Sequence, residues 1–389
     1  MPDMAAHARF FASPTEGNAA ETVRTIAAGR LKKTRHRITD ALEKSGLQPA
    51  AESLLAFAGG TGTAWRPETG LALLAHRNQS TSFAALQLAA AYAGMGSSGT
   101  IEVALDRPHW LYFDGWLLPV DGQCRLESDG GSISVNSALS CAQYSKSEDE
   151  HFIPADAPFG PWFAYPTGGL VPRYVTASGL RHSGEGFPWI SAVPSAEFLQ
   201  PPAPENDRIA VIHEGWQVIL DKTPVYRNWV ASTATGCLLL DKNGINDAQS
   251  GSGYDHPGLI ALMPPDCAVF CGELLVHECS HQHLLIYIMV VPVVTPDSNE
   301  TAYSPIKGSI RTIERVLLGA HAVGNMIIYY AELSRNMSLD QASKERFDLR
   351  RKWFAEDYRP TLNNCVSLTP AGRDLWDSLC RAVDSAMEN

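Results

Sequence analysis

The sequence predicts an α+β fold made of three regions in chain order. A mainly helical N-terminal region comes first, an antiparallel β segment lies in the middle, and a zincin-like helix with an HExxH motif packs on a C-terminal helical region. Apolar residues recur at helical spacing up to about residue 100, and short β-prone runs separated by Asp-Gly pairs follow. Long apolar stretches bounded by prolines dominate the last third of the chain.

Two helices are predicted near the N-terminus. From Glu21 to Gly46 apolar residues recur among charges, and the glycine is a typical stop. The stretch "TSFAALQLAAAYAGMG" at 81–96 is rich in alanine and leucine, which favour helix.

From Thr100 onward the sequence pattern predicts an antiparallel β-meander. The runs "TIEVAL", "HWLYF" and "SISV" alternate with Asp-Gly turn pairs at 114–115, 121–122 and 129–130. Prolines and aromatic residues then predict long, ordered loops. We expect their aromatic side chains to pack these loops, with the lining of a peptide groove as the alternative: Trp162, Phe163, Tyr165 and Trp189. We therefore divide the chain into an N-terminal region at 1–150 and a metal-binding region at 151–389, although one domain would also fit.

The second half is expected to hold two long helices. Segments 208–220 and 236–240 fit either strand or short helix. Asp266 is expected to cap a helix that ends near Val291, before a proline. Ser309 is expected to cap another helix from Ile310 to Arg335.

Composition narrows the classes of function. A net charge of −11 and a pI near 5.5 argue against binding to duplex nucleic acid, which needs clustered cations. The N-terminus lacks the pattern of a secretion signal, and no run reaches the roughly 18 apolar residues of a membrane span. We therefore expect a cytoplasmic protein without a membrane partner. The eight cysteines form no CxxC pair, so reduced, buried thiols are expected.

The motif "HECSH" places ionisable groups inside an apolar helix. His277 and His281 lie one turn apart on one face, so both rings can reach one metal ion. Glu278 lies beside the first histidine, where it can polarise water at the metal. Ionisable groups in an apolar segment need compensation for lost hydration, which favours a metal site over satisfied core histidines.

The third metal ligand has to come from elsewhere, because no HExxHxxGxxH extension follows. His321, among small residues on the second long helix, is our first choice, and Glu314, seven positions earlier on nearly the same face, is the alternative. Glu300 and Glu332 are weaker candidates. His283 is expected to point away from the site. Two histidines with a glutamate would resemble the gluzincin peptidases, whereas three histidines fit zinc or Fe(II).

Two segments resemble a family: "HPGLIALMPPDCAVFCGELLVHECSHQHL" (256–284) and "YSPIKGSIRTIERVLLGAHAVGNM" (303–326). They are similar to the HExxH-motif peptide-modification proteins encoded beside ribosomally synthesised peptides. The resemblance covers about seventy residues and implies a non-haem Fe(II) enzyme that uses 2-oxoglutarate and dioxygen to hydroxylate a precursor peptide, typically at a β-carbon.

The resemblance also implies roles for named residues. His277, His281 and His321 would hold the iron, and Arg311 would bind a carboxylate of 2-oxoglutarate. Arg315 qualifies equally on chemical grounds, because a guanidinium matches a carboxylate in bidentate geometry. Glu278 would hydrogen-bond a ligand or a water molecule at the metal.

Two other functions remain open at this point. A zinc metallopeptidase would use Glu278 as general base. A peptide-binding protein with a zinc-stabilised core would have no turnover.

Overall fold

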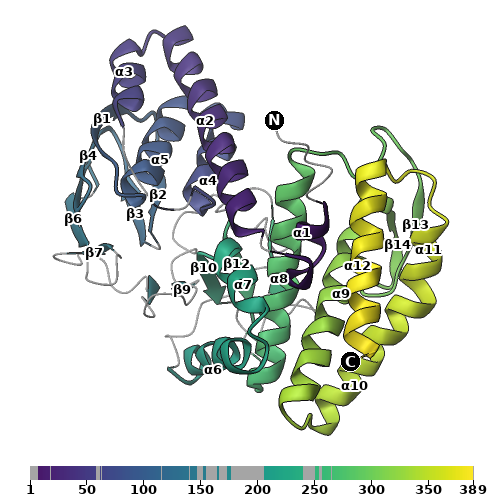
Figure 1. Cartoon of the computed structure of the whole chain (residues 1–389). Helices are drawn as coiled ribbons and strands as arrows, with labels where there is room; N and C mark the ends of the chain where they lie inside the picture. Colours follow the sequence, from purple (N-terminus) through teal and green to yellow (C-terminus); the bar gives the residue numbers. More distant parts are fainter. Residues whose placement is uncertain are drawn as a thin grey trace. The chain divides into compact units, whose positions relative to one another are not determined.

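The structure is a computed structural model of the chain. It describes residues 8–17, 19–57, 62, 64–114, 116–139, 141–146, 152–154, 164–165, 173–176, 206–239, 250–253, 256–263 and 265–388. Helices and strands are both present in separate groups, so the predicted α+β class is confirmed (Figure 1).

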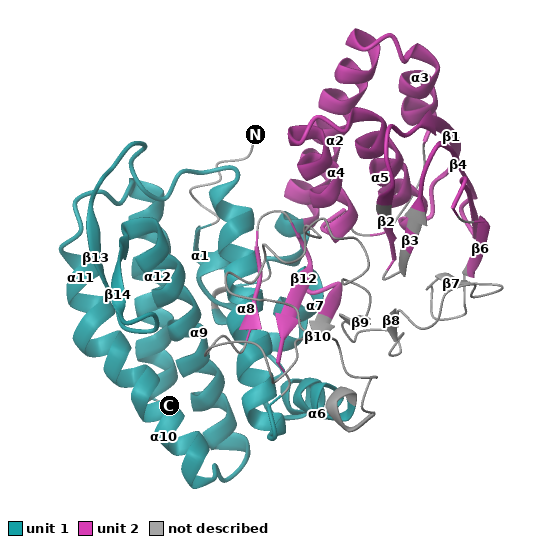
Figure 2. Ribbon diagram, turned by 180° about the vertical axis from the view of Figure 1, so that it is seen from behind, with its two compact units in different colours: residues 1–23, 206–233, 264–389 teal, residues 24–205, 234–263 magenta. Residues whose placement is uncertain are grey.

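The chain forms two compact units, each built from separate stretches of sequence (Figure 2). Unit 1 contains residues 1–23, 206–233 and 264–389, and unit 2 contains residues 24–205 and 234–263. This division does not coincide with the expected boundary at residue 150. Because the chain returns to each unit, local composition gives no sign of the division.

Unit 2 begins with helices and continues into antiparallel strands. The predicted helices at 21–46 and 81–96 correspond to α2 (Ala20–Lys44), which begins at the end of unit 1, and α5 (Thr81–Gly94). Between them lie α3 (Gln48–Ala56) and α4 (Pro67–Arg77). An antiparallel sheet of order β1-β4-β5-β6-β7 follows: β1 (Ser98–Ala104), β4 (Gln123–Asp129), β5 (Ser132–Asn136), β6 (Cys141–Lys146) and β7 (Phe152–Pro154).

The predicted meander is interrupted by a separate hairpin of β2 (His109–Phe113) and β3 (Trp116–Val120). β1 therefore pairs with β4 instead of its neighbour in sequence. Buried Gln87 in α5 holds the hairpin, because its side chain bonds both the N–H and the C=O of Tyr112. Turn signals alone could not predict this exchange of partners.

A second sheet of unit 2 is mixed, with the order β11-β12-β10-β9-β8. The ambiguous segment 236–240 is strand β10 (Gly236–Leu239), which pairs in parallel with β12 (Leu259–Leu262) and β9 (Arg173–Thr176). β11 (Ser250–Gly251) and β8 (Ala164–Tyr165) complete it. All four residues of β12 are buried, as is typical of interior parallel strands. The side chains of the aromatic group around Trp162 lie outside the described residues.

Unit 1 is mainly helical (Figure 1). Its helices and strands are α1 (Ala8–Ala12), η2 (Pro14–Glu16), α6 (Asn206–Lys222), α7 (Tyr226–Thr233), α8 (Ala268–Ile288), β13 (Thr301–Ser304), β14 (Ser309–Thr312), α9 (Ile313–Asn336), α10 (Gln341–Lys352), the π-helix η5 (Trp353–Tyr358), α11 (Arg359–Asn363) and α12 (Pro370–Glu388).

Both long helices of the second half are present, with shifted starts. α8 begins after Cys267, so Asp266 is not its N-cap. The second helix, α9, begins at Ile313 after Thr312, and the prediction of a start at Ile310 is wrong. Residues 309–312 instead form β14, because pairing with 301–304 satisfies their backbone groups and suits the β-branched Ile310 and Thr312.

α8 is the central helix of unit 1. Its sequence is apolar around the whole circumference, a pattern typical of a helix buried on all sides. Gly215 of α6 and Gly272 of α8 permit a close approach of these two helices, because a Cβ on either would overlap neighbouring atoms. The Tyr329 hydroxyl of α9 also lies against Gly272, and it donates to the Val269 carbonyl oxygen of α8.

α9 is long and apolar enough to cross a membrane by length and composition. Its most apolar window is 94% buried inside the protein, which is equally typical of a core helix. Small Gly324 faces the Leu379 side chain of α12, so α9 is packed from several sides.

Candidate metal centre

The two motif histidines occupy the accessible face of a buried helix. Between Phe270 and Tyr287, every residue of α8 is buried except His277 and His281. The His277 side chain is 14% exposed, while that of Glu278 is 2% exposed. The histidine pair can therefore be reached by a ligand, and the glutamate beside it is shielded.

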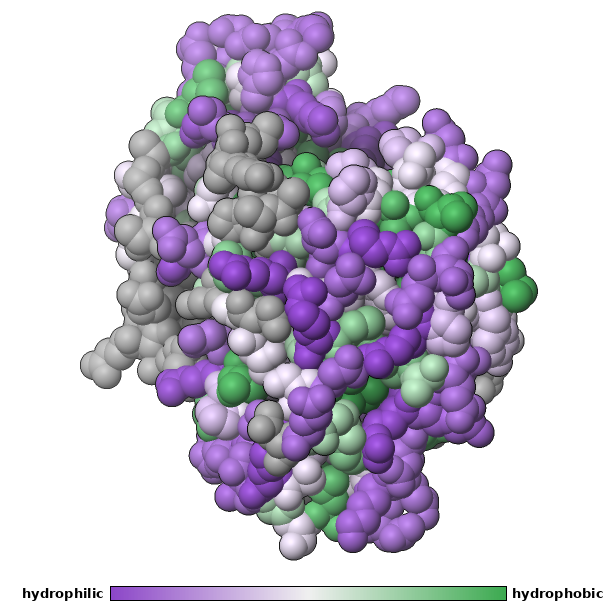
Figure 3. All heavy atoms as spheres, turned by 45° about the vertical axis from the view of Figure 1, so that its right-hand side comes forward, coloured by the Kyte–Doolittle hydropathy of each residue, from purple (hydrophilic) through white to green (hydrophobic). Residues whose placement is uncertain are grey.

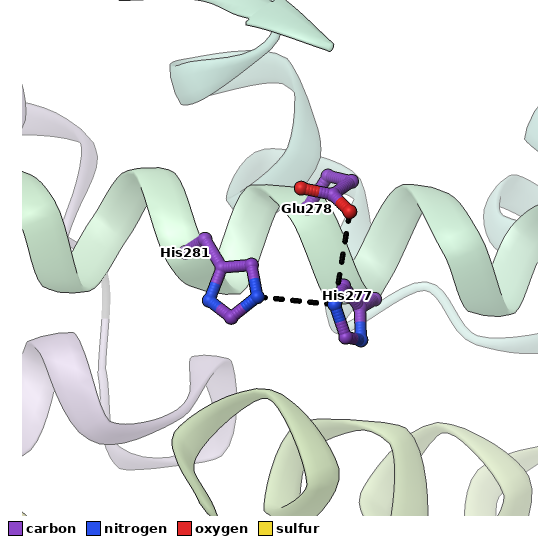
Figure 4. Close-up of side chains that lie close together, drawn as sticks. All are labelled: His277, Glu278 and His281. Atoms are coloured by element: carbon purple, nitrogen blue, oxygen red, sulfur yellow. Dashed lines mark hydrogen bonds and ion pairs between the residues drawn. The ribbon is translucent and has the colours of Figure 1, made fainter. Parts of the chain in front are cut away.

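The pair has the geometry of two ligands to one ion. The Nε2 atoms of His277 and His281 lie 3.0 Å apart, and both rings project from one side of α8 (Figure 4). Glu278 Oε1 lies 3.7 Å from His277 Nε2. One ligand atom from each of the three residues lies within 4.8 Å of the others. Since metal–imidazole bonds are about 2.1 Å long, both histidines can reach a single ion. The donor set fits a transition metal.

Both imidazoles are held in the neutral form that binds metals. Burial lowers the pKa of His277 well below its usual value and that of His281 to about 3. Neighbouring histidines act in the same direction, His281 on His277 and His321 on His281, and so do three nearby cations: Lys307 on both, Arg350 on His277 and Arg315 on His281. Neutral imidazole is the ligating form, so the site is ready to bind at neutral pH.

These cations come from three different elements. Lys307 lies in the turn of the β13–β14 hairpin, Arg315 in the first turns of α9, and Arg350 in α10. Sequence reasoning identified only Arg315. Lys307 carried a weak signal, because it lies within the second of the two segments already chosen for their resemblance. No sequence signal indicated Arg350, because it lies in a basic run that is typical of the exposed face of a helix.

His321 lies outside the group of three. Its Nε2 lies 2.7 Å from the carbonyl oxygen of Phe11, so that nitrogen carries the proton and donates. Among the described residues, the only potential metal-binding group is the motif's own His277, Glu278 and His281. His321 is completely buried, and this burial lowers its pKa to about 4. The helical face on which His321 lies could be predicted from the sequence. The packing of the N-terminal segment against that face could not.

The carboxylate candidates for a third ligand also lie apart from the pair. Glu300 accepts the backbone N–H of Ser367, and Glu332 pairs with Arg335 on the same helix. Glu314 is half-buried in the first turn of α9 and does not belong to the group. These three carboxylates therefore lie outside the group formed by His277, Glu278 and His281.

The two candidate arginines differ in their relation to the histidines. Arg311 is half-buried in β14, opposite Ala302, and is not among the charges that lower the pKa of either histidine. The expectation that it lies on the same helix as His321 is wrong. Arg315 is exposed on α9, and its charge does act on His281.

His283 behaves as expected from its position. It is buried on the other side of α8, where its Nε2 lies 2.9 Å from the Trp229 carbonyl oxygen and its ring stacks on the Trp229 indole. It is a structural residue of the interface with α7. The segment 208–220, which fitted either strand or short helix, lies within α6, where His213 is half-buried.

A buried ion pair fixes α8 one turn before the first motif histidine. The carboxylate of Glu273 accepts hydrogen bonds from the Tyr330 hydroxyl, at 2.6 Å, and from Arg350 Nε, at 3.0 Å. Glu273 is completely buried and the Arg350 side chain is 14% exposed. The network joins α8, α9 and α10 beside His277. Nothing in the sequence pattern indicated it.

No protein-family model matches this chain, and no curated protein matches it significantly. The function is therefore inferred from the residues of the site.

Proposed function

We propose that the protein is an Fe(II)- and 2-oxoglutarate-dependent hydroxylase that acts on a side chain of a ribosomally synthesised precursor peptide. The observation that carries this proposal is the neutral, accessible pair of His277 and His281 with facing Nε2 atoms. The sequence resemblance supplies the choice of iron and of the keto acid. In this proposal α8 is the active-site helix of a zincin-like arrangement.

Each residue of the site has a defined task. His277 and His281 hold the metal, and the third ligand comes from a group outside the described cluster or from the cosubstrate. Glu278, buried beside His277, accepts a hydrogen bond and holds ligands or water in place. Arg315 is the better candidate than Arg311 to bind a 2-oxoglutarate carboxylate, because its charge acts on His281.

When bound, ferrous iron with dioxygen and 2-oxoglutarate supplies the oxidation that turns a substrate C–H into C–OH, while the keto acid loses carbon dioxide and becomes succinate. The chain's own contribution is to keep the imidazoles neutral and to place cations where anionic groups bind.

The test is anaerobic purification, loading with Fe(II) and incubation with a precursor peptide, 2-oxoglutarate and oxygen. A peptide mass gain of about 16 Da with one succinate per hydroxylation is the expected result. Succinate without peptide modification, or modification without 2-oxoglutarate, would contradict it.

A zinc metallopeptidase is the second candidate, and one observation favours it. The Glu278 carboxylate lies 3.7 Å from His277 Nε2, and in a peptidase it would act as the general base that activates water. Peptide fragments that appear with zinc and disappear with a chelator would support this function over hydroxylation.

A further inference from the structure

The β13–β14 hairpin is a two-stranded sheet, so the outer edge of β14 has no neighbour among the described strands. The N–H of Ile313 donates to the Glu300 carbonyl oxygen at 3.1 Å, which continues the ladder and fixes its alternation. The pair Tyr303 and Ile310 is then a non-hydrogen-bonded pair, so the backbone groups of both residues point outward from the hairpin. Within the described part of the chain, no hydrogen bond occupies them.

The side chains at this edge are apolar and exposed. Tyr303 is 47% exposed and its cross-strand partner Ile310 is 65% exposed. Seen from the side of α10–α12, the surface is mainly hydrophilic with separate hydrophobic patches (Figure 3). β14 is only four residues long and carries Arg311, two features that commonly protect natural edge strands, but its outward backbone groups at Ile310 are unpaired among the described residues.

The turn of the hairpin carries a positive charge. Lys307, which lies between β13 and β14, is exposed. No carboxylate among the described residues forms an ion pair with it. A ligand that pairs with β14 therefore meets this cation where the strand begins.

The turn is also held in place. The Tyr358 hydroxyl of the π-helix lies against Gly319 of α9, and a Cβ at this glycine would overlap it. The Ile306 side chain, in the turn of the hairpin, lies against the same glycine. Single π-turns are frequent at functional sites, and this one packs beside the hairpin that carries Lys307.

We propose that β14 is the docking strand for the substrate, which adds to its edge as an extended peptide and places an acidic side chain against Lys307. Main-chain hydrogen bonds to Ile310 would supply affinity, and the lysine would select acidic segments. This inference rests on the proposed peptide-modifying function, because it names how that substrate is held and which peptides are preferred.

The first experiment measures binding without turnover. The probe is a fluorescent peptide of about ten residues that alternates Glu and Val, compared with its Gln-Val analogue and with a version N-methylated at alternate residues. All are titrated against the full chain without 2-oxoglutarate or oxygen. We expect the Glu-Val peptide to bind at least about fivefold more tightly than both. Equal affinity for the N-methylated peptide would overturn strand addition, and equal affinity for the Gln-Val peptide would overturn the role of charge.

The second experiment uses matched variants. Ile310→Pro removes the outward N–H without breaking the ladder, and Tyr303→Pro makes the same change on the other edge. Only Ile310→Pro should weaken binding, by about fivefold. Lys307→Glu should weaken binding of the acidic peptide more than Lys344→Glu, an equal charge change on exposed α10.

Equal effects within either pair of variants would contradict the assignment to β14. If Ile310→Pro does not fold, the N-methylated peptide still decides the question, because it uses the unaltered protein. Peptide binding without any turnover would remove the proposed enzyme function and leave docking intact. Turnover of a precursor peptide, with no preference for acidic or unmethylated probes, would support the enzyme function and remove docking on β14.

Discussion

The His321 imidazole donates from Nε2 to the carbonyl oxygen of Phe11, across 2.7 Å, and so ties α9 to the N-terminal helix α1. The motif histidines face each other on the accessible side of α8, and the charge of His321 acts on His281. The histidine expected to complete the metal site thus lies in the core of unit 1.

His321→Ala should destabilise the protein without removing its metal. The substitution leaves a cavity and an unpaired carbonyl in the core, so we expect a loss of about 2–4 kcal/mol in the free energy of unfolding. Urea denaturation and metal analysis on the same preparation provide the measurement. Loss of the metal from folded His321→Ala would restore His321 as a ligand.

His281→Ala should have the opposite pattern. The side chain lies on the accessible face, so stability of the metal-free protein should change by less than about 1 kcal/mol. Metal affinity should fall by at least about 100-fold, because one of two facing imidazoles is gone. His283→Gln is the matched control, and it should retain the metal. Unchanged metal content in His281→Ala would exclude the site.

Acid should destabilise the metal-free protein between about pH 6.5 and pH 4. Burial lowers the pKa of His283 to about 3 and that of His321 to about 4, from the usual 6.5. In this range the unfolded chain binds more protons than the folded chain. The free energy of unfolding therefore decreases as the pH decreases, by up to about 1.4 kcal/mol per pH unit for each histidine. The melting temperature of chelator-treated protein, measured against pH, should show this slope. In His283→Gln this slope should be smaller, by an amount that corresponds to about one proton. An unchanged slope would mean that His283 does not contribute to the pH dependence.

Glu273→Gln should destabilise the interface of three helices beside the metal pair. It leaves the Arg350 guanidinium buried without its carboxylate, which typically costs about 3–5 kcal/mol. The double variant with Arg350→Met should recover part of this loss, because the unpaired charge is then absent. Denaturation of the single and double variants completes the cycle, and additive effects would show that the pair is not coupled.

Glu278→Gln distinguishes the two candidate enzymes. As a general base of a peptidase, Glu278 is required for turnover, and cleavage should fall by at least about 100-fold with the metal retained. In a hydroxylase it only orients ligands, so peptide hydroxylation should decrease by about tenfold or less. Liquid chromatography with mass spectrometry follows both products. A fully active variant would leave Glu278 without either role.

Local patterns in the chain were enough to predict several features. Helical periodicity and glycine stops located α2 and α5, and the spacing of His277 and His281 placed both rings on one helical face, because a turn of helix is a fixed geometry. The same rule placed His283 on the other side of α8.

What those helical faces meet depends on packing between distant segments. The N-terminal segment fills the place beside His321, β14 takes residues 309–312 out of the expected helix, and Lys307 and Arg350 approach the pair from distant elements. The ion pair of Glu273 and Arg350 joins residues 77 positions apart. A local pattern could not predict these contacts, because it carries no information on which distant backbone or charge will satisfy a given side chain.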